Sequence, residues 1–218
     1  MNAAVQAIQS PGHAAGYVPA CGTIEARTAI AHYHSFHDHT VSPDNAIVAN
    51  GCSGALELVL TALLDDDSIL LVPKPGFPLY QVIAESHGAT VAHYNLDPYN
   101  NWEIDLEHME SLINDNVRGI VINNPSNPTG SVYSEQHLRA ILDVCDRYHL
   151  PIIADEVYGD LAFGDNQYIS MAQVMIQMGR KVPVIVTSGL AKQYLLPGWR
   201  VGWAVFYDRY IIYPCSQF

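Results

Sequence analysis

The sequence predicts a three-layer α/β/α domain with a mainly parallel central sheet, and two observations support this class. Short apolar runs rich in β-branched residues alternate along the chain with longer segments of helical period. Runs such as 119–123 and 151–155 are apolar almost throughout, as expected for parallel strands with both faces covered. Such alternation is typical of a sheet whose strands are joined by crossover helices.

Strands and helices are expected to follow one another in turn. We expect strands at 46–49, 68–72, 90–95, 119–123, 151–155, 184–187 and 201–206. We expect helices at 23–36, 53–64, 78–87, 105–113, 134–149 and 171–178. Ser53 and Ser134 are candidate N-caps of the second and fifth helices, and Gly88 suits the position after the third.

The two ends of the chain have the pattern of incomplete folding units. Residues 1–16 contain no segment expected to pack by itself. The chain stops one short segment after its last predicted strand, where a crossover is expected to continue. We therefore expect a large domain at 17–208, preceded by an incomplete N-terminal segment and followed by a truncated end at 209–218.

The composition limits the possible partners. The chain has 218 residues, with 22 acidic against 10 basic side chains and a formal net charge of −12. Such a surface repels the phosphates of nucleic acids and anionic lipids, so neither is expected as a partner. The sequence has no run of about 18 apolar residues that would span a bilayer, no visible signal peptide and no C-x-x-C pair. We expect a cytoplasmic protein with free thiols.

The turn GCSGALE at 51–57 is the first candidate site. Gly51 and Gly54 allow a tight turn between a strand end and a helix start. Ser53, Gly54 and Ala55 are expected to present free backbone N–H groups there, an arrangement that suits a phosphate. An ordinary capped helix is the alternative, because neither a P-loop nor a G-x-G-x-x-G pattern is present.

Polar residues follow two of the predicted parallel strands. The loop NNPSNPTGSVYS at 123–134 can project an amide, for which Asn127 is the candidate, although its Asn-Pro and Pro-Thr-Gly steps also form turns by themselves. Asp155 and Glu156 end the next strand, and Tyr158 follows. A buried carboxylate needs a cationic partner, and a protonated heterocyclic nitrogen is one. Asp155 is the expected ligand, with Glu156 as its support; a solvent-facing or structural Glu156 is the alternative.

An amine and a guanidinium lie in the apolar segment 184–203. Lys192 follows a strand and a Ser-Gly turn, and burial there would favour the uncharged amine that attacks a carbonyl carbon. Arg200 comes eight residues later and suits phosphate oxygens. A solvated lysine is the alternative.

Four histidines lie close together, but they do not predict a metal site. His32, His34, His37 and His39 contain no i, i+4 pair and have no cysteine nearby, so we expect a solvated helix end and no metal. A Ser-His-Asp triad is not expected either, because G-x-S-x-G is missing.

Taken in this order, the segments resemble the fold-type I pyridoxal-phosphate (PLP) aminotransferases, and more narrowly their tyrosine aminotransferase branch. The most specific stretches are NNPSNPTGSVYS, IADEVYGD and SGLAKQYLLPGWRVGW, with VPKPGFPLY and NWEIDLEHME as further matches. The resemblance runs from about Tyr17 to Asp208. It implies the large PLP-binding domain of that fold, with PLP as cofactor.

The resemblance assigns a role to each matching residue. Lys192 matches the lysine that forms a Schiff base with PLP and later shuttles a proton. Asp155 matches the carboxylate that keeps the pyridine nitrogen protonated, and Tyr158 and Asn127 match the groups hydrogen-bonded to the ring 3′-oxygen. Phe77 matches the aromatic ring that stacks on PLP, with core packing as its alternative. The phosphate-binding groups are matched by Ser53, Gly54, Ala55, Ser188 and Arg200.

The resemblance also implies partners and a reaction. Tyr17 matches a tyrosine lent to the phosphate of the neighbouring subunit, which implies a homodimer. The N-terminal cover of the active site and the C-terminal small domain, with its arginine for the substrate carboxylate, have no match. The implied reaction is transamination of an aromatic, tyrosine-like amino acid with a 2-oxo acid such as 2-oxoglutarate. A PLP-dependent C–S lyase or other β-eliminating enzyme, and a catalytically incomplete PLP-binding fragment, are the alternatives.

Overall fold

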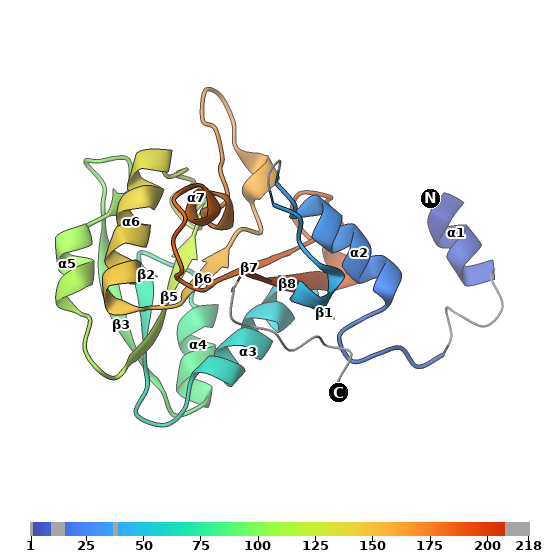
Figure 1. Cartoon of the computed structure of the whole chain (residues 1–218), viewed down its shortest axis with the longest axis horizontal. Helices are drawn as coiled ribbons and strands as arrows, with labels where there is room; N and C mark the ends of the chain where they lie inside the picture. Colours follow the sequence, from blue (N-terminus) through green and yellow to red (C-terminus); the bar gives the residue numbers. More distant parts are fainter. Residues whose placement is uncertain (1, 10–15, 37–38, 208–218) are drawn as a thin grey trace.

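A computed structural model of the chain describes residues 2–9, 16–36 and 39–207, within which one eight-stranded sheet forms the centre (Figure 1). The strands are β1 (Ala46–Asn50), β2 (Ile69–Lys74), β3 (Thr90–Asp97), β4 (Glu103–Ile104), β5 (Val117–Asn123), β6 (Ile152–Asp155), β7 (Val184–Gly189) and β8 (Val201–Tyr207). The helices are α1 (Asn2–Gln9), α2 (Ile24–Tyr33), α3 (Gly51–Leu63), α4 (Leu79–Ser86), α5 (Leu106–Ser111), α6 (Glu135–Tyr148) and α7 (Met171–Gln177).

The strand order across the sheet is β1-β8-β7-β6-β5-β2-β3-β4. Strands β3, β2, β5, β6 and β7 are parallel neighbours. Because β8 is antiparallel to both β7 and β1, β1 runs in the direction of the parallel strands. The carboxyl ends of these six strands therefore meet at one edge of the sheet, together with the start of β8. The predicted mainly parallel sheet is confirmed.

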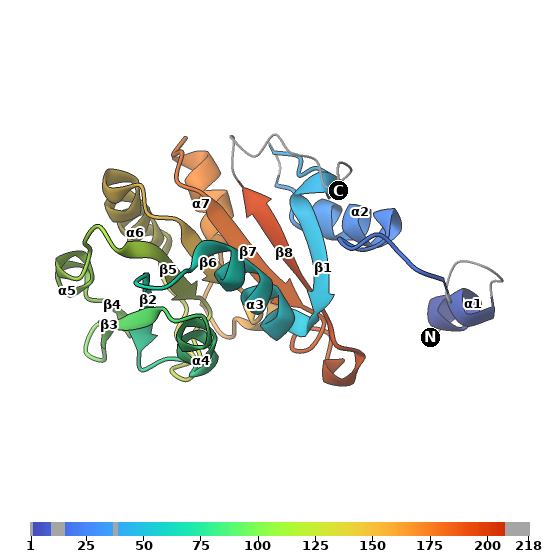
Figure 2. The ribbon, with the colours of Figure 1, turned by 90° about the horizontal axis from the view of Figure 1, so that it is seen from below.

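Helices cover both faces of the sheet and give the molecule two apolar cores. One core collects side chains from α2, α5, α6 and α7, among them Met109, Leu138 and Val174, each 0% exposed. The other lies under α3 and α4, with Leu60 and Ile83; Figure 2 shows these two helices in front of the sheet. Burial of each large apolar side chain contributes about 1.5–3 kcal/mol, so both helix layers stabilise the sheet.

The helix α6 shows how the sequence determines an element. Buried residues recur at Leu138, Ile141, Leu142 and Cys145, the spacing that places side chains on one helix face. The Ser134 side chain accepts a hydrogen bond from the His137 amide at 3.2 Å, so the predicted N-cap is confirmed.

All seven predicted strands and six predicted helices are present, with ends that shift by up to three residues. The predicted cap at Ser53 is wrong, because α3 begins at Gly51 and Asn50 holds the cap position. A positive φ of 72° at Gly51 turns the chain from β1 directly into the helix.

The strand β4 and the helix α1 were not predicted, nor were three 3-10 turns at 43–45, 159–161 and 197–199. The strand β4 has two residues and no alternating pattern of its own. The helix α1 forms within residues 1–16 and lies apart from the sheet in Figures 1 and 2, so its presence does not contradict the expectation that no segment there packs by itself. The domain limits at 16 and 208 remain a prediction.

Candidate functional site

A cavity of about 270 Å³ lies at the sheet edge where the carboxyl ends of the strands meet. Its walls come from the start of α3, the segment before and within α4, the ends of β5 and β6, and the connection from β7 to β8. The lining residues are Cys52, Ser53, Leu56, Phe77, Tyr80, Asn123, Asn127, Asp155, Val157, Tyr158, Ala191, Lys192, Pro197 and Arg200.

The structure brings most of the predicted site residues into this one cavity. They are Ser53, Phe77, Asn127, Asp155, Tyr158, Lys192 and Arg200. Because α3 begins at Gly51, the backbone N–H groups that lack partners within the helix are those of Gly51, Cys52 and Ser53, so the expectation of free N–H groups at Gly54 and Ala55 is wrong. Ser188 is buried in β7 and Tyr17 is fully exposed, and neither lines the cavity. The roles of these residues remain predictions.

Asp155 ends β6 and is only 4% exposed. Its Oδ2 accepts a hydrogen bond from the Tyr80 hydroxyl at 2.6 Å, and its Oδ1 accepts from the Val157 amide at 3.3 Å and the Cys52 thiol at 3.6 Å. Burial raises the pKa of Asp155, and these three hydrogen bonds oppose that rise. Within the described ranges, no lysine, arginine or histidine forms an ion pair with this carboxylate.

The loop that carries Asn127 is tied to the end of β6. The side-chain amide of Asn123 donates to the carbonyl of Asp155 at 3.1 Å. The same side chain accepts a hydrogen bond from the backbone amide of Asn127 at 2.7 Å. Asn123 therefore places Asn127 beside Asp155.

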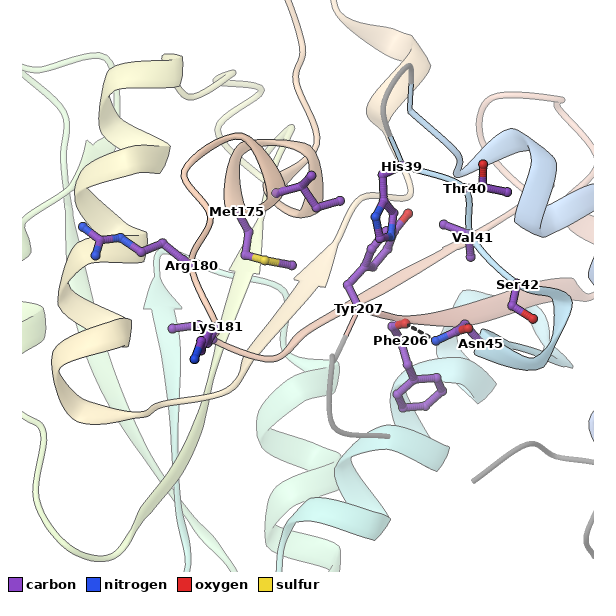
Figure 3. Close-up of a pocket in the computed structure, with 12 residues that line it drawn as sticks. His39, Thr40, Val41, Ser42, Asn45, Met175, Arg180, Lys181, Phe206 and Tyr207 are labelled. Carbon is purple, nitrogen blue, oxygen red and sulfur yellow. Dashed lines mark hydrogen bonds between the residues drawn. The ribbon is translucent and has the colours of Figure 1, made fainter. Parts of the chain in front are cut away.

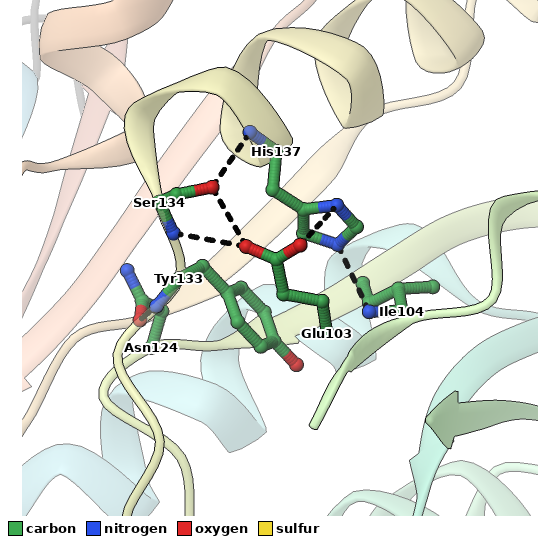
Figure 4. Close-up of polar contacts among 6 residues, drawn as sticks. All are labelled: Glu103, Ile104, Asn124, Tyr133, Ser134 and His137. Carbon is green, nitrogen blue, oxygen red and sulfur yellow. Dashed lines mark hydrogen bonds and ion pairs between the residues drawn. The ribbon is translucent and has the colours of Figure 1, made fainter. Parts of the chain in front are cut away.

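A polar cluster anchors the far end of this loop to β4 (Figure 4). Glu103 accepts hydrogen bonds from the Ser134 hydroxyl at 2.7 Å and the Ser134 amide at 3.3 Å. The His137 Nε2 accepts from the Ile104 amide at 2.9 Å, so its proton lies on Nδ1, 3.5 Å from Glu103. Burial lowers the pKa of His137, while the Glu103 charge opposes this. The cluster holds the start of α6, and with it the loop, against the sheet.

Lys192 lies at the mouth of the cavity, with its Nζ 5.6 Å from the centre of the Tyr158 ring. The expectation that it is buried is wrong, because its side chain is exposed. The apolar residues beside it face outward on the same turn, with Tyr194 50% and Leu195 81% exposed. Apolar neighbours in sequence therefore do not desolvate this amine in the described chain.

Arg200 packs against the start of α3. A Cβ atom at Gly51 would lie 2.5 Å from Nη2 of Arg200, and Nη1 donates to the Pro197 carbonyl at 3.2 Å. A Cβ atom at Gly202 would overlap the Gly51 backbone. A guanidinium next to the positive end of a helix dipole is repelled by it, whereas an anion bound between the two is attracted to both. This corner of the cavity fits a phosphate.

The fold and this combination of groups define a PLP-binding domain of fold type I. The buried Asp155 lacks a cation in the described part of the chain and fits a protonated ring nitrogen, Lys192 supplies an amine, and Arg200 with the α3 start fits the phosphate. A family model, Aminotransferase class I and II, matches residues 1–213. The chain belongs to this family, whose members depend on PLP.

Individual relatives agree with this assignment. A tyrosine aminotransferase of Bos taurus is 45% identical over 194 residues, which cover 89% of this chain and 42% of that protein. An S-alkyl-thiohydroximate lyase of Arabidopsis thaliana is 35% identical over 208 residues, covering 95% of this chain and 45% of that protein. The crystal structure of a tyrosine aminotransferase from Leishmania infantum superposes with a TM-score of 0.90 at 32% identity, covering 97% of this chain and 57% of that one. The chain spans less than half the length of these two curated relatives.

Seven lining residues were not among the predicted site residues, and three of them, Asn123, Tyr80 and Cys52, have polar side chains. Asn123 begins the motif from which Asn127 was chosen, and Tyr80 ends the PGFPLY stretch that contains Phe77. Cys52 precedes the predicted phosphate turn residue Ser53. Membership of a quoted motif was the only signal for all three, because each residue type at its position is also typical of a turn or of the core.

Within the histidine segment, His34 departs from the expected solvated helix end, whereas His32 is exposed as expected. His34 is buried, its Nε2 accepts a hydrogen bond from Trp203 at 2.7 Å, and burial lowers its pKa to about 4. His37 lies outside the described residues. Among the residues with a described position, no group of three potential metal ligands occurs, and none of their helices is long and apolar enough to cross a bilayer.

A second cavity, of about 320 Å³, lies at the opposite edge of the sheet (Figure 3). His39, Arg180 and Tyr207 are among its lining residues. The Arg180 guanidinium already pairs with Asp143 and Asp146 of α6. This cavity contains none of the predicted site residues.

Proposed function

We propose that the whole protein catalyses PLP-dependent transamination of an aromatic, tyrosine-like amino acid, with a 2-oxo acid such as 2-oxoglutarate as acceptor. The observation that carries this proposal is the meeting of Asp155, Lys192 and Arg200 in one cavity of a chain from the aminotransferase family. The names of the relatives with tyrosine aminotransferase activity support the aromatic substrate.

Four side chains of the cavity, those of Asp155, Arg200, Lys192 and Phe77, have a task in this proposal. Bound PLP supplies an aldehyde for the amino group and a ring that accepts electrons from the α-carbon. Asp155 holds the ring nitrogen by charge, and Arg200 with the start of α3 holds the phosphate. Lys192 holds the cofactor through Nζ and, as a free amine, accepts and returns the substrate proton. Phe77 covers one wall with an apolar ring.

Cofactor attachment provides the test. We expect the protein mixed with PLP to show a visible absorption band, and borohydride to fix the cofactor covalently on the peptide that contains Lys192. The variant Lys192→Ala is expected to lose both. A borohydride-treated protein without cofactor on Lys192 would contradict the proposal.

A PLP-dependent C–S lyase is the second candidate, and the relationship to the Arabidopsis lyase favours it. A lyase releases its oxo-acid product without an acceptor, whereas a transaminase requires one. We therefore propose to measure oxo-acid formation by the whole protein with and without 2-oxoglutarate. Dependence on 2-oxoglutarate supports transamination, and independence supports the lyase.

We also propose a cytoplasmic homodimer for the whole protein. Tyr17 supports the dimer, because its side chain is fully exposed and matches a residue lent to a neighbouring subunit. Sedimentation is expected to give a dimer, and Tyr17→Phe is expected to weaken PLP binding.

Cell fractionation tests the location. Turnover measured on the 218-residue chain beside a longer form separates an active domain from a catalytically incomplete fragment.

A further inference from the structure

Two cavity side chains outside the predicted set donate hydrogen bonds to the Asp155 carboxylate. Building on the proposed function, we propose that Tyr80 and Cys52 are positioning residues that hold the Asp155 carboxylate in one orientation and in its charged form. Tyr80 has the larger effect of the two.

The hydrogen bonds reach both oxygens of the carboxylate. Oδ2 accepts the Tyr80 hydroxyl at 2.6 Å, a distance typical of a charge-assisted O–H···O bond. Oδ1 accepts the Cys52 thiol at 3.6 Å and the Val157 amide at 3.3 Å, and a thiol is a weak donor. Because the donors come from α4, α3 and the loop after β6, rotation of the carboxylate would break contacts with separate elements.

Both side chains remain donors at neutral pH. Burial, followed by the negative charge of Asp155, raises the pKa of the Tyr80 hydroxyl and of the Cys52 thiol. Burial also raises the pKa of Asp155, and the Tyr80 hydrogen bond is the strongest of the contacts that lower it. Without this hydroxyl, Asp155 takes up a proton at higher pH and loses the charge that would face a cationic ring nitrogen.

Tyr80 also connects Asp155 to the wall of the cavity. Its side chain is 1% exposed and belongs to the core under α3 and α4. Its ring meets the Phe77 ring edge-to-face, with centres 5.8 Å apart and planes at 83°. A change of Tyr80 to Phe keeps this ring contact and removes only the hydroxyl, so it isolates the hydrogen bond to Asp155.

The experiment compares Tyr80→Phe with the unchanged 218-residue chain. Infrared difference spectroscopy follows the protonation of Asp155 against pH in the cofactor-free protein, and the signal is assigned by its loss in Asp155→Asn. Fluorescence titration gives the affinity for PLP. We expect the Asp155 titration to move to higher pH by about one unit and PLP binding to weaken about tenfold, the effect of losing a hydrogen bond to a charged group. Cys52→Ala is expected to give a smaller shift in the same direction.

Tyr94→Phe is the matched control. Tyr94 is 0% exposed, and its hydroxyl donates to the Val121 carbonyl at 2.6 Å without lining the cavity. This variant loses a comparable buried hydrogen bond but is expected to leave both readouts unchanged.

An unchanged titration and affinity in Tyr80→Phe would overturn the proposal, and so would equal shifts in Tyr94→Phe. Failure of the unchanged chain to bind PLP would instead count against the proposed function, because the titration of Asp155 needs no cofactor.

Discussion

Asp155 and Glu156 are adjacent carboxylates at the end of β6, with nearly equal exposure of 4% and 5%. Successive residues of an extended chain point to opposite faces. Asp155 lines the cavity beside α3 and α4, whereas Glu156 faces α7. Its Oε1 accepts hydrogen bonds from the Ser170 hydroxyl at 3.1 Å and from the Met171 amide at 2.9 Å, at the start of that helix.

The comparison teaches that burial alone does not identify a functional carboxylate. Burial raises the pKa of both groups, that of Glu156 to about 7. The difference is the surroundings: Asp155 shares a cavity with an amine and a guanidinium, while Glu156 is enclosed by Tyr168, Ser170 and Met171. Glu156 therefore stabilises the docking of α7, which is the structural alternative that the sequence left open.

The largest effect is expected for Asp155→Asn. Removing one partner of a buried charge pair costs about 3–5 kcal/mol, so PLP binding should weaken about 10²- to 10⁴-fold. Absorption titration with PLP measures this. The free energy of unfolding without cofactor should not fall, because the variant removes a buried charge.

Glu156→Gln is the matched control for that experiment, and we expect its PLP affinity to stay within about twofold, since it faces the other side of the sheet. An equal loss of affinity in both variants would show that the two carboxylates act together and would break the comparison.

The same Glu156→Gln variant should change how stability depends on pH. The folded pKa of Glu156 is about 7, above its usual 4.5, so its contribution to stability is complete below pH 4.5 and disappears as the pH rises through 7. The loss is about 3 kcal/mol in the free energy of unfolding. Denaturant titrations at several pH values should find it in the wild type and not in the variant.

The difference in free energy of unfolding between the wild type and Glu156→Gln is the quantity to follow, because His34 changes stability with pH in the opposite direction. Its folded pKa of about 4 lies below its usual 6.5, so its contribution is lost as the pH falls through this range. Both proteins share that effect. A wild type and variant with parallel pH profiles would show that Glu156 does not titrate in this range.

Gly202→Ala tests the phosphate corner and leaves both carboxylates in the sequence, although Cys52, which contacts Asp155, lies beside the added Cβ. The added Cβ overlaps the backbone of Gly51, so the start of α3 must move away from β8. We expect a loss of about 1–3 kcal/mol in the free energy of unfolding, together with weaker PLP binding. Thermal or denaturant unfolding measures the first and absorption titration the second. A destabilised variant with unchanged affinity for PLP would show that the start of α3 does not contribute to the phosphate site.

The smallest effect is expected for Arg200→Lys. Lysine keeps the charge but loses the planar fork that binds two phosphate oxygens. Loss of one hydrogen bond of about 0.5–1.5 kcal/mol should weaken PLP binding roughly two- to tenfold. The free energy of unfolding of the cofactor-free protein should stay the same. A loss of PLP affinity larger than that in Asp155→Asn would show that the phosphate end of the cavity contributes more to binding than the Asp155 end.

Much of the fold was predictable because apolar runs and helix caps act locally. The runs that became β5, β6 and β7 are apolar on both faces, and Ser134 caps α6 as expected. The start of α3 was misplaced because Ser53 is a good cap residue, while the turn at Gly51 depends on its packing against Gly202. Such a contact between distant residues leaves no local pattern.

The site divides in the same way. Asp155, Asn127 and Lys192 follow strands of one direction, so the topology brings them to one edge, as predicted. Tyr80 was missed because it lies on a helix whose apolar face packs on the sheet, and its contact with Asp155 requires β2 to neighbour β5 and β5 to neighbour β6. The exposure of Lys192 was missed because apolar neighbours in the sequence do not show whether a turn faces the core or the solvent.

The link from β7 to β8 sets the spacing between Lys192 and Arg200. Pairing from Val184 with Tyr207 to Gly189 with Gly202 fixes both strands, so the number of residues between them determines how far Nζ of Lys192 sits from the guanidinium of Arg200. Deleting one residue from 193–199 would keep every functional group in the protein and still spoil their spacing. To redesign this domain for a longer or shorter cofactor, the length of this link should therefore be changed before the identity of its residues.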